Sequence, residues 1–205
     1  MHNIDIRKYK IDLREKCKKR RKEMDPAEKA EKDKKIAERV KLLYQYKSAD
    51  TVMVYVSTEI EVDTREIIKN AWADGKKVAV PRCIPYSRLM EFHYITSFND
   101  LSPGSFSVLE PDEHLPIVKD FSKSLMLVPA FMFSSLGYRL GYGKGYYDRY
   151  MSKYTGNAVG ICYSEDFKIH MYHGRYDRPV DAVVTENWIR NTVKNRKPQK
   201  IKARI

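Results

Sequence analysis

Two short apolar runs, residues 51–57 (TVMVYVS) and 77–81 (KVAVP), are separated by a single amphipathic segment. Continuous apolar runs with β-branched residues are typical of strands that are covered on both faces. Between them, Asp63 or Thr64 is placed to cap a helix that ends at Asp74 and the glycine after it. Strand, helix and strand within about 30 residues form a βαβ unit, which predicts a parallel sheet.

Further strands are predicted at residues 124–129, 158–163 and 181–185, which are short runs of apolar and β-branched residues. Residues 90–95 alternate between apolar and polar side chains, and this pattern indicates an edge or antiparallel strand. The stretch 97–121 is rich in proline, so we expect mostly loop there, long enough to act as a lid.

The N-terminal region, residues 4–45, is predicted to form a pair of helices. The first spans residues 4–24, and its apolar side chains fall on one stripe: Ile6, Tyr9, Leu13, Cys17 and Met24. The second begins at Asp25, which can cap, with Pro26 at the first helical position. With the strands, these helices predict one three-layer α/β domain over residues 1–189, with a mixed, mostly parallel sheet and helices on both faces.

The net charge of +12 is concentrated at the two ends of the chain. Residues 1–40 carry 15 Lys and Arg against 9 Asp and Glu, and residues 190–205 carry 7 basic and no acidic residues. The segment between them holds 17 basic and 18 acidic residues and is nearly neutral. A solvated helix face plus a basic tail, residues 190–205, is the simpler interpretation. A nucleic-acid-binding module that uses the basic ends is the alternative, but we recognise no motif for it and expect no nucleic-acid partner.

The three cysteines, Cys17, Cys83 and Cys162, are far apart and odd in number. They lack the spacing of a metal site and make a disulfide framework unfavourable, so a reducing, cytoplasmic compartment is expected. No stretch approaches the ~20 apolar residues of a membrane helix, and the first residues lack the apolar core of a signal peptide. We therefore expect no membrane partner. We also expect the protein to be a monomer.

Residues 137–148 (GYRLGYGKGYYD) form the segment best suited to chemistry. Three glycines alternate just before a predicted helix: Gly141, Gly143 and Gly145. Glycines let backbone N–H groups approach a phosphate, and Arg139 and Lys144 add two positive charges. The spacing is neither that of a P-loop nor that of a dinucleotide-binding fingerprint. A tight turn that leads into a helix therefore remains the alternative.

Other candidates lie on separate elements. Asp148 follows the glycine segment and Asp181 begins a strand; both offer the oxygen ligands that Mg²⁺ prefers, although capping or solvent exposure explains either one alone. Lys10 and Arg14 share one helix face, which is also the pattern of a solvated basic face. Glu61 follows the first strand, where open α/β sheets bind ligands. Three aromatic residues are either core or the wall of a site for a flat ligand: Tyr142, Tyr146 and Tyr147.

Residues 139–148 (RLGYGKGYYD) resemble the signature of the 5-formyltetrahydrofolate cyclo-ligase family, also called methenyltetrahydrofolate synthetase. Four further blocks are similar to the family in character and order: Lys10 with Arg14, residues 55–64 (YVSTEIEVDT), residues 128–131 (VPAF) and residues 180–186 (VDAVVTE). The signature is fairly specific, and the other blocks support it because all five occur in one chain.

The resemblance implies an enzyme that uses ATP and Mg²⁺ to convert 5-formyltetrahydrofolate to 5,10-methenyltetrahydrofolate, with release of ADP and phosphate. The formyl oxygen is phosphorylated, and N10 of the folate then attacks the activated carbon. The basic ends would attract the anionic glutamate chains of cellular folates. A catalytically inactive relative that only binds folate is a further alternative, and the intact Arg139, Lys144, Asp148 and Asp181 argue against it.

The resemblance also assigns roles residue by residue. The implied ATP-binding residues are Lys10, Arg14, Arg139, Leu140, Gly141, Tyr142, Gly143, Lys144, Gly145, Tyr146 and Tyr147. The implied folate contacts are Val56, Glu61, Tyr142, Gly143, Lys144, Gly145 and Tyr146. Asp148 and Asp181 would hold Mg²⁺, while Arg139 and Lys144 would stabilise the phosphoryl group during its transfer.

Overall fold

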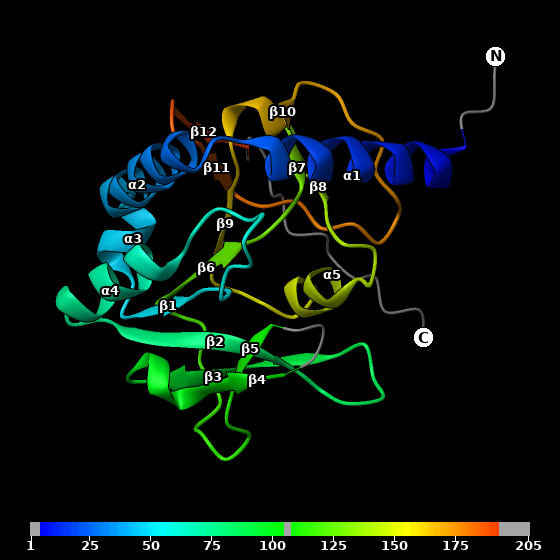
Figure 1. Ribbon diagram of the computed structural model, residues 1–205. Helices are drawn as coiled ribbons and strands as arrows, with labels where there is room; N and C mark the ends of the chain where they lie inside the picture. Colours follow the sequence, from blue (N-terminus) through cyan, green and yellow to red (C-terminus); the bar gives the residue numbers. More distant parts are fainter. Residues whose placement is uncertain (1–4, 105–107, 193–205) are drawn as a thin grey trace.

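The computed structural model of the protein describes residues 5–104 and 108–192 (Figure 1). Its central sheet contains β1 (Thr51–Met53), β2 (Lys77–Cys83), β3 (Met90–Ile95), β6 (Ser124–Val128), β9 (Asn157–Ile161), β11 (Ala182–Val184) and β12 (Ile189–Asn191). Within the described residues this sheet has seven strands in the order β12-β11-β9-β6-β1-β2-β3. The inner pairs are parallel, while β3 and β12 are antiparallel to their neighbours at the two edges. The predicted mixed, mostly parallel sheet is confirmed.

Helices cover both faces of this sheet. The helices are α2 (Pro26–Leu42), α3 (Tyr44–Ser48) and α4 (Arg65–Ala73) on one side and α5 (Tyr146–Met151) on the other (Figure 1). Neighbouring residues of one strand enter different cores: Val52 packs in the cluster that holds Ile36 of α2, and Met53 packs in the cluster that holds Met151 of α5. Burial on both faces explains why the strands are continuously apolar. The predicted three-layer arrangement is confirmed.

The first helix, α1 (Ile6–Glu23), lies outside these layers, over a small second sheet. Asp5 caps it by accepting hydrogen bonds from two backbone N–H groups of its first turn. The small sheet contains β7 (Met132–Ser134), β8 (Arg139–Leu140) and β10 (Phe167–Lys168) in the order β10-β7-β8. Cys17 of α1 packs with Met132 and Leu140 in a core cluster of its own. This packing places α1 beside the strand that leads into the glycine segment.

The region 97–121 is more ordered than its prolines predict. It contains a 3₁₀ turn at Phe98–Asp100 and an antiparallel pair, β4 (Leu101–Pro103) and β5 (Leu109–Pro111). Ser97 and Asp100 form a reciprocal capping box, which fixes the turn that leads into β4. Residues 105–107 of the predicted loop lie outside the described residues.

The strand predicted at 51–57 is shorter than the apolar run, because β1 ends at Met53. The chain beyond it stays buried but leaves the sheet. Thr64 donates a hydrogen bond from its hydroxyl to the carbonyl oxygen of Tyr55 at 2.7 Å, and the hydroxyl of Tyr55 donates to the carbonyl oxygen of Val62 at 3.1 Å. The apolar residues after β1 therefore line a folded loop, and this loop carries Glu61.

β12 crosses the predicted boundary between residues 189 and 190, so the sheet continues to Asn191. Residues 193–205 of the predicted basic tail lie outside the described residues. In the part of the chain that is described, no helix combines the length and the apolar character needed to cross a membrane.

Candidate functional site

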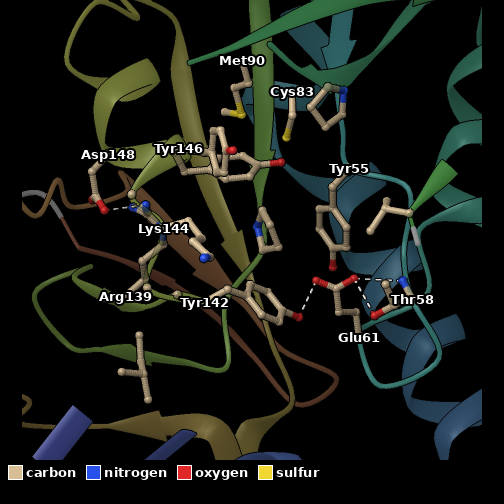
Figure 2. A pocket seen from close by; sticks show the side chains of 18 of the residues that line it. Tyr55, Thr58, Glu61, Cys83, Met90, Arg139, Tyr142, Lys144, Tyr146 and Asp148 are labelled. Atoms are coloured by element: carbon tan, nitrogen blue, oxygen red, sulfur yellow. Dashed lines mark hydrogen bonds and ion pairs between the residues drawn. The ribbon is translucent and has the colours of Figure 1, made fainter. Parts of the chain in front are cut away.

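A cavity of about 550 Å³ opens where parallel strands end (Figure 2). Tyr55 and Val56 follow β1, Cys83 ends β2 and Pro129 follows β6, and all four line the cavity. This edge of an open α/β sheet is where ligands usually bind. The structure brings the following sequence-predicted residues together on its wall: Lys10, Arg14, Val56, Glu61, Arg139, Leu140, Gly141, Tyr142, Gly143, Lys144, Gly145, Tyr146, Tyr147 and Asp148.

Two glycines of the segment have backbone conformations that other residues rarely adopt. The φ angle is +90° at Gly143 and +75° at Gly145. A Cβ atom at Gly145 would also lie 2.7 Å from the guanidinium of Arg149. The segment is held from the other side by Arg14, whose Nε donates to the carbonyl oxygen of Gly141 at 2.7 Å. Gly143 and Gly145 are therefore needed by the turn, and α1 braces that turn.

Positive and negative side chains alternate along this part of the wall. Lys10 pairs with Asp177 at 2.6 Å, and Arg139, which is buried, pairs with Asp148 at 2.9 Å. Burial acts to raise the pKa of Asp177, but the hydrogen bond from Lys10, a backbone N–H and the charges of Lys10 and Arg139 together lower it. Burial lowers the pKa of Arg14, partly opposed by Asp177. A guanidinium remains charged despite such a shift, so the wall presents cations that are already oriented.

The opposite end of the cavity carries the carboxylate of Glu61, which is only 6% exposed. Its Oε1 accepts a hydrogen bond from the hydroxyl of Tyr142 at 2.6 Å, and its Oε2 accepts from the backbone N–H and the hydroxyl of Thr58 at 2.8 and 2.9 Å (Figure 2). Burial, and next the charge of Glu61, raise the pKa of Tyr142, so this hydroxyl stays protonated and donates. The carboxylate is thereby fixed in orientation as a hydrogen-bond acceptor.

The family of the chain follows from its similarity to known proteins. Residues 6–186 match the model of the 5-formyltetrahydrofolate cyclo-ligase family. The chain belongs to this family. The resemblance drawn from the five sequence blocks is thereby confirmed, and with it the prediction of a cyclo-ligase enzyme.

Solved structures agree with this assignment. The NMR structure of Aquifex aeolicus 5,10-methenyltetrahydrofolate synthetase is similar with a TM-score of 0.80 and 27% sequence identity, over 95% of this chain and 98% of that one. The fold is also that of a 5,10-methenyltetrahydrofolate synthetase from Mycoplasma pneumoniae, with a TM-score of 0.69 and 23% identity over 86% of this chain and 98% of the other. Among curated protein sequences, none matches the chain.

Asp181 is the one predicted site residue of this cyclo-ligase that does not line the cavity. It precedes β11 and therefore lies at the amino end of a parallel strand, whereas the cavity opens at carboxyl ends. Its Oδ2 accepts a hydrogen bond from the backbone N–H of Ala158 at 2.8 Å. The structure thus brings Asp148, but not Asp181, to the cavity wall.

The cavity fits a phosphate-bound Mg²⁺ better than a metal held by protein alone. Among the described residues no three His, Cys, Asp or Glu side chains are grouped so that they could hold a metal ion. Asp148 is the wall carboxylate that lies within the signature, residues 139–148. Mg²⁺ is commonly bound by one or two carboxylates together with substrate phosphates and water, so Asp148 alone is sufficient for that mode.

Several wall residues of the cyclo-ligase had no signal in the sequence. Asp177 lies in a polar stretch without a motif, and its pairing with Lys10 depends on tertiary structure. Cys83 at the end of β2 donates its backbone N–H to Glu110 of β5 at 3.2 Å. A buried carboxylate thus joins the β4–β5 pair to the end of β2 at the cavity wall.

Cys83 yields a chemical test of this wall. Burial raises the pKa of its thiol to about 11, and the neighbouring Glu110 carboxylate adds to the effect. Because the thiolate is the reactive form, about one thiol in a thousand is ionised at pH 8, and alkylation by iodoacetamide should be about a hundredfold slower than for free cysteine. Between pH 8 and pH 10 the rate should rise about tenfold per pH unit, as read by peptide mass spectrometry.

The same experiment has internal controls, since Cys17 and Cys162 are buried in the folded protein and should remain unmodified until it unfolds. A Cys83 alkylation rate that has already reached its plateau at pH 8 would contradict the raised pKa.

Proposed function

We propose that this cyclo-ligase converts 5-formyltetrahydrofolate to 5,10-methenyltetrahydrofolate, while ATP is converted to ADP and phosphate. The observation that carries the proposal is the two-ended cavity: cations and the glycine segment lie at one end, and the fixed carboxylate of Glu61 lies at the other. A volume of about 550 Å³ is within the range of small-molecule sites. Such a cavity suits two ligands that must react with each other.

The basic end is suited to the phosphates of ATP. Lys10, Arg14 and Lys144 line it with residues 139–148, whose backbone is free of Cβ atoms at three positions. The hydroxyl of Tyr147 is buried and has no hydrogen-bond partner among the described residues. Buried polar groups are rarely left unsatisfied, so a ligand atom at this point would supply the missing partner.

The acidic end is suited to the pterin of the folate. An ionised carboxylate only accepts hydrogen bonds, and each oxygen can accept more than one. Glu61 is held by Tyr142 and Thr58 and still has lone pairs for the amino and ring N–H groups of a pterin. Val56 is apolar and buried, so its contribution is packing against the ring. Tyr142 contributes to both ends of the cavity, because it orients Glu61 at the acidic end and lies in the glycine segment at the basic end.

The proposed reaction has two steps. The oxygen of the N5-formyl group attacks the γ-phosphorus of ATP, the bond from that phosphorus to the bridging oxygen breaks, and ADP leaves with its electron pair. N10 then attacks the activated formyl carbon and loses its proton, and the carbon–oxygen bond breaks. Phosphate departs with the former formyl oxygen, which leaves the N5=CH–N10 cation. The protein mainly positions the two reactants and offsets phosphate charge.

Arg139 and Lys144 are the residues we assign to charge stabilisation during phosphoryl transfer. In the structure Arg139 pairs with Asp148. Asp148 is the residue we assign to Mg²⁺, which when bound to ATP neutralises part of the charge on its phosphates. The Arg139–Asp148 pair therefore keeps a cation and a carboxylate side by side where the phosphates would lie.

The test is a direct assay of the purified protein with 5-formyltetrahydrofolate and Mg²⁺. Addition of ATP should produce a rise in near-ultraviolet absorbance from the methenyl product, with one ADP and one phosphate formed per product. Chelation of Mg²⁺ should abolish the rise. Absence of any ATP-dependent product would overturn the proposal, and folate binding without turnover would instead support the inactive, folate-binding alternative.

A further inference from the structure

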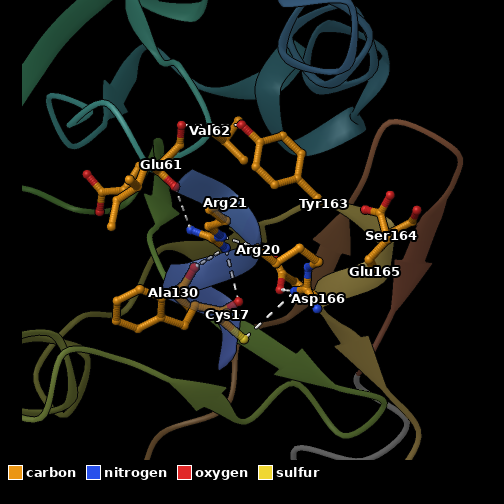
Figure 3. Close-up of polar contacts among 12 residues, drawn as sticks. Cys17, Arg20, Arg21, Glu61, Val62, Ala130, Tyr163, Ser164, Glu165 and Asp166 are labelled. Atoms are coloured by element: carbon orange, nitrogen blue, oxygen red, sulfur yellow. Dashed lines mark hydrogen bonds and ion pairs between the residues drawn. The ribbon is translucent and has the colours of Figure 1, made fainter. Parts of the chain in front are cut away.

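Arg21, in the last turn of α1, is buried with 4% of its surface exposed. Arginine is almost never buried to this degree unless each of its polar groups has a partner. The guanidinium lies between the loop that carries Glu61, the chain after β6 and the 3₁₀ turn Ser164–Asp166 (Figure 3). It does not line the cavity.

The guanidinium donates four hydrogen bonds. Its Nε donates to Oδ2 of Asp166 at 2.9 Å, and Asp166 has no exposed surface. One terminal nitrogen donates to the carbonyl oxygen of Ile60 at 3.2 Å. The other donates to the carbonyl oxygens of Ala130 and Phe131 at 2.9 and 3.0 Å. Three segments that are distant in sequence are therefore joined at one planar group (Figure 3).

One of these segments carries Glu61, and another packs against Tyr142, which donates the hydrogen bond to Glu61 at the acidic end of the cavity. Ile60 immediately precedes Glu61, so the Arg21 contact fixes the peptide that leads into this carboxylate. The ring of Phe131 packs against the ring of Tyr142 with centroids 4.5 Å apart, and Tyr142 donates to Glu61. Arg21 thus positions Glu61 through its hydrogen bond to Ile60, and it positions Tyr142 through its hydrogen bond to Phe131.

Arg21 also lies on the same helix as the residues at the basic end. Lys10, Arg14 and Arg21 are separated by four and seven residues, a spacing that keeps them on one face of α1. Lys10 and Arg14 line the cavity beside the glycine segment, and Arg21 contacts the Glu61 side. One helix therefore sets the position of both ends of the cavity.

We propose that Arg21 is a positioning residue that aligns the Glu61 carboxylate for the folate. This inference rests on the proposed function, since it assigns Arg21 to the folate end of the same site. The planar guanidinium reaches four acceptors in three directions, and a lysine ammonium cannot reproduce that geometry although it keeps the charge. Loss of the geometry should change folate recognition without changing ATP recognition.

The test is Arg21→Lys, measured as separate KM values for the two substrates. We expect the KM for 5-formyltetrahydrofolate to rise about tenfold, while the KM for ATP changes less than about twofold, because a small displacement of a positioned group weakens only the contacts that it makes. The matched control is Arg20→Lys. Arg20 also contacts Asp166 but none of the three carbonyl groups, so its substitution should leave both KM values unchanged.

A double-mutant cycle with Glu61→Gln distinguishes positioning from general loosening. If Arg21 acts through Glu61, the Arg21→Lys effect on folate KM should disappear in the Glu61→Gln background. Additive effects, or equal rises in both KM values, would overturn the inference. If Arg21→Lys does not fold, Asp166→Asn must show the same selective rise in folate KM, and its absence counts against the inference. An inactive wild-type protein would instead overturn the proposed function.

Discussion

Replacing Glu61 by glutamine is expected to raise the KM for 5-formyltetrahydrofolate by about tenfold to a hundredfold, because a hydrogen bond to a charged group contributes about 1.5–3 kcal/mol. Glutamine has nearly the same size, and its amide oxygen can keep both contacts from Thr58, at 2.8 and 2.9 Å in the structure. Its NH₂ group would then replace Oε1, which accepts from the hydroxyl of Tyr142 at 2.6 Å, and would meet donors both from this hydroxyl and from a pterin. Initial rates followed by methenyl absorbance measure the effect.

The matched control for this variant is Glu59→Gln. Glu59 lies on the same loop, but it is exposed and does not line the cavity. Exposed substitutions of this kind usually change binding or stability by less than about 0.5 kcal/mol, so the folate KM should stay within about twofold. Equal effects of the two variants would show that loop charge, rather than the fixed carboxylate, determines folate affinity.

Simple local geometry explains why some cavity residues could be predicted from the sequence to lie close together. Lys10 and Arg14 are one helical turn apart, so they necessarily share a face. Glu61 follows the first strand of a parallel sheet, and the carboxyl ends of such strands form the binding edge. Residues 139–148 are contiguous, so their proximity needs no tertiary information. Local periodicity and strand direction explain why these positions can meet, and the resemblance to the family singled them out among the other charged residues.

Strand direction also bears on Asp181. Residues that precede a parallel strand lie at the amino edge of the sheet, away from the cavity, and the structure places Asp181 just before β11. The resemblance alone paired Asp181 with Asp148. In the structure Asp148 lies in α5 on the cavity wall, whereas Asp181 lies at the amino edge of the sheet. The sequence motif does not encode this difference.

The residues that the sequence could not predict depend on contacts between distant segments. The separation between Arg21 and Asp166 is 145 residues, and that between Lys10 and Asp177 is 167 residues. In the sequence Arg21 is one of many cations on a basic helix, and a solvated face explains all of them equally well. Only the contacts with Asp166, with the chain between β6 and β7 and with Ile60 before Glu61 separate the buried arginine from its exposed neighbours.

The glycine segment carries the second large expected effect. Replacing Lys144 by methionine should lower kcat by about a hundredfold to a thousandfold, the usual loss when one preorganised group that stabilises transition-state charge is removed. Lys144 lines the cavity between Gly143 and Gly145, and its side chain points into the cavity (Figure 2). Methionine keeps the length of the side chain and removes the charge that phosphoryl transfer requires. Single-turnover rates at saturating ATP measure the chemical step.

Lys153→Met is the control, because Lys153 is exposed just beyond α5 and does not line the cavity. It should leave kcat unchanged. The positive φ angles of Gly143 and Gly145 fix the backbone on either side of Lys144, so Lys144→Met should fold normally. Because we assign the charge of Lys144 to the phosphates, the folate KM should change much less than kcat. The two large effects therefore fall on different parameters, kcat for Lys144 and folate KM for Glu61. If both variants altered the same parameter, the two-ended cavity would not describe how the site works.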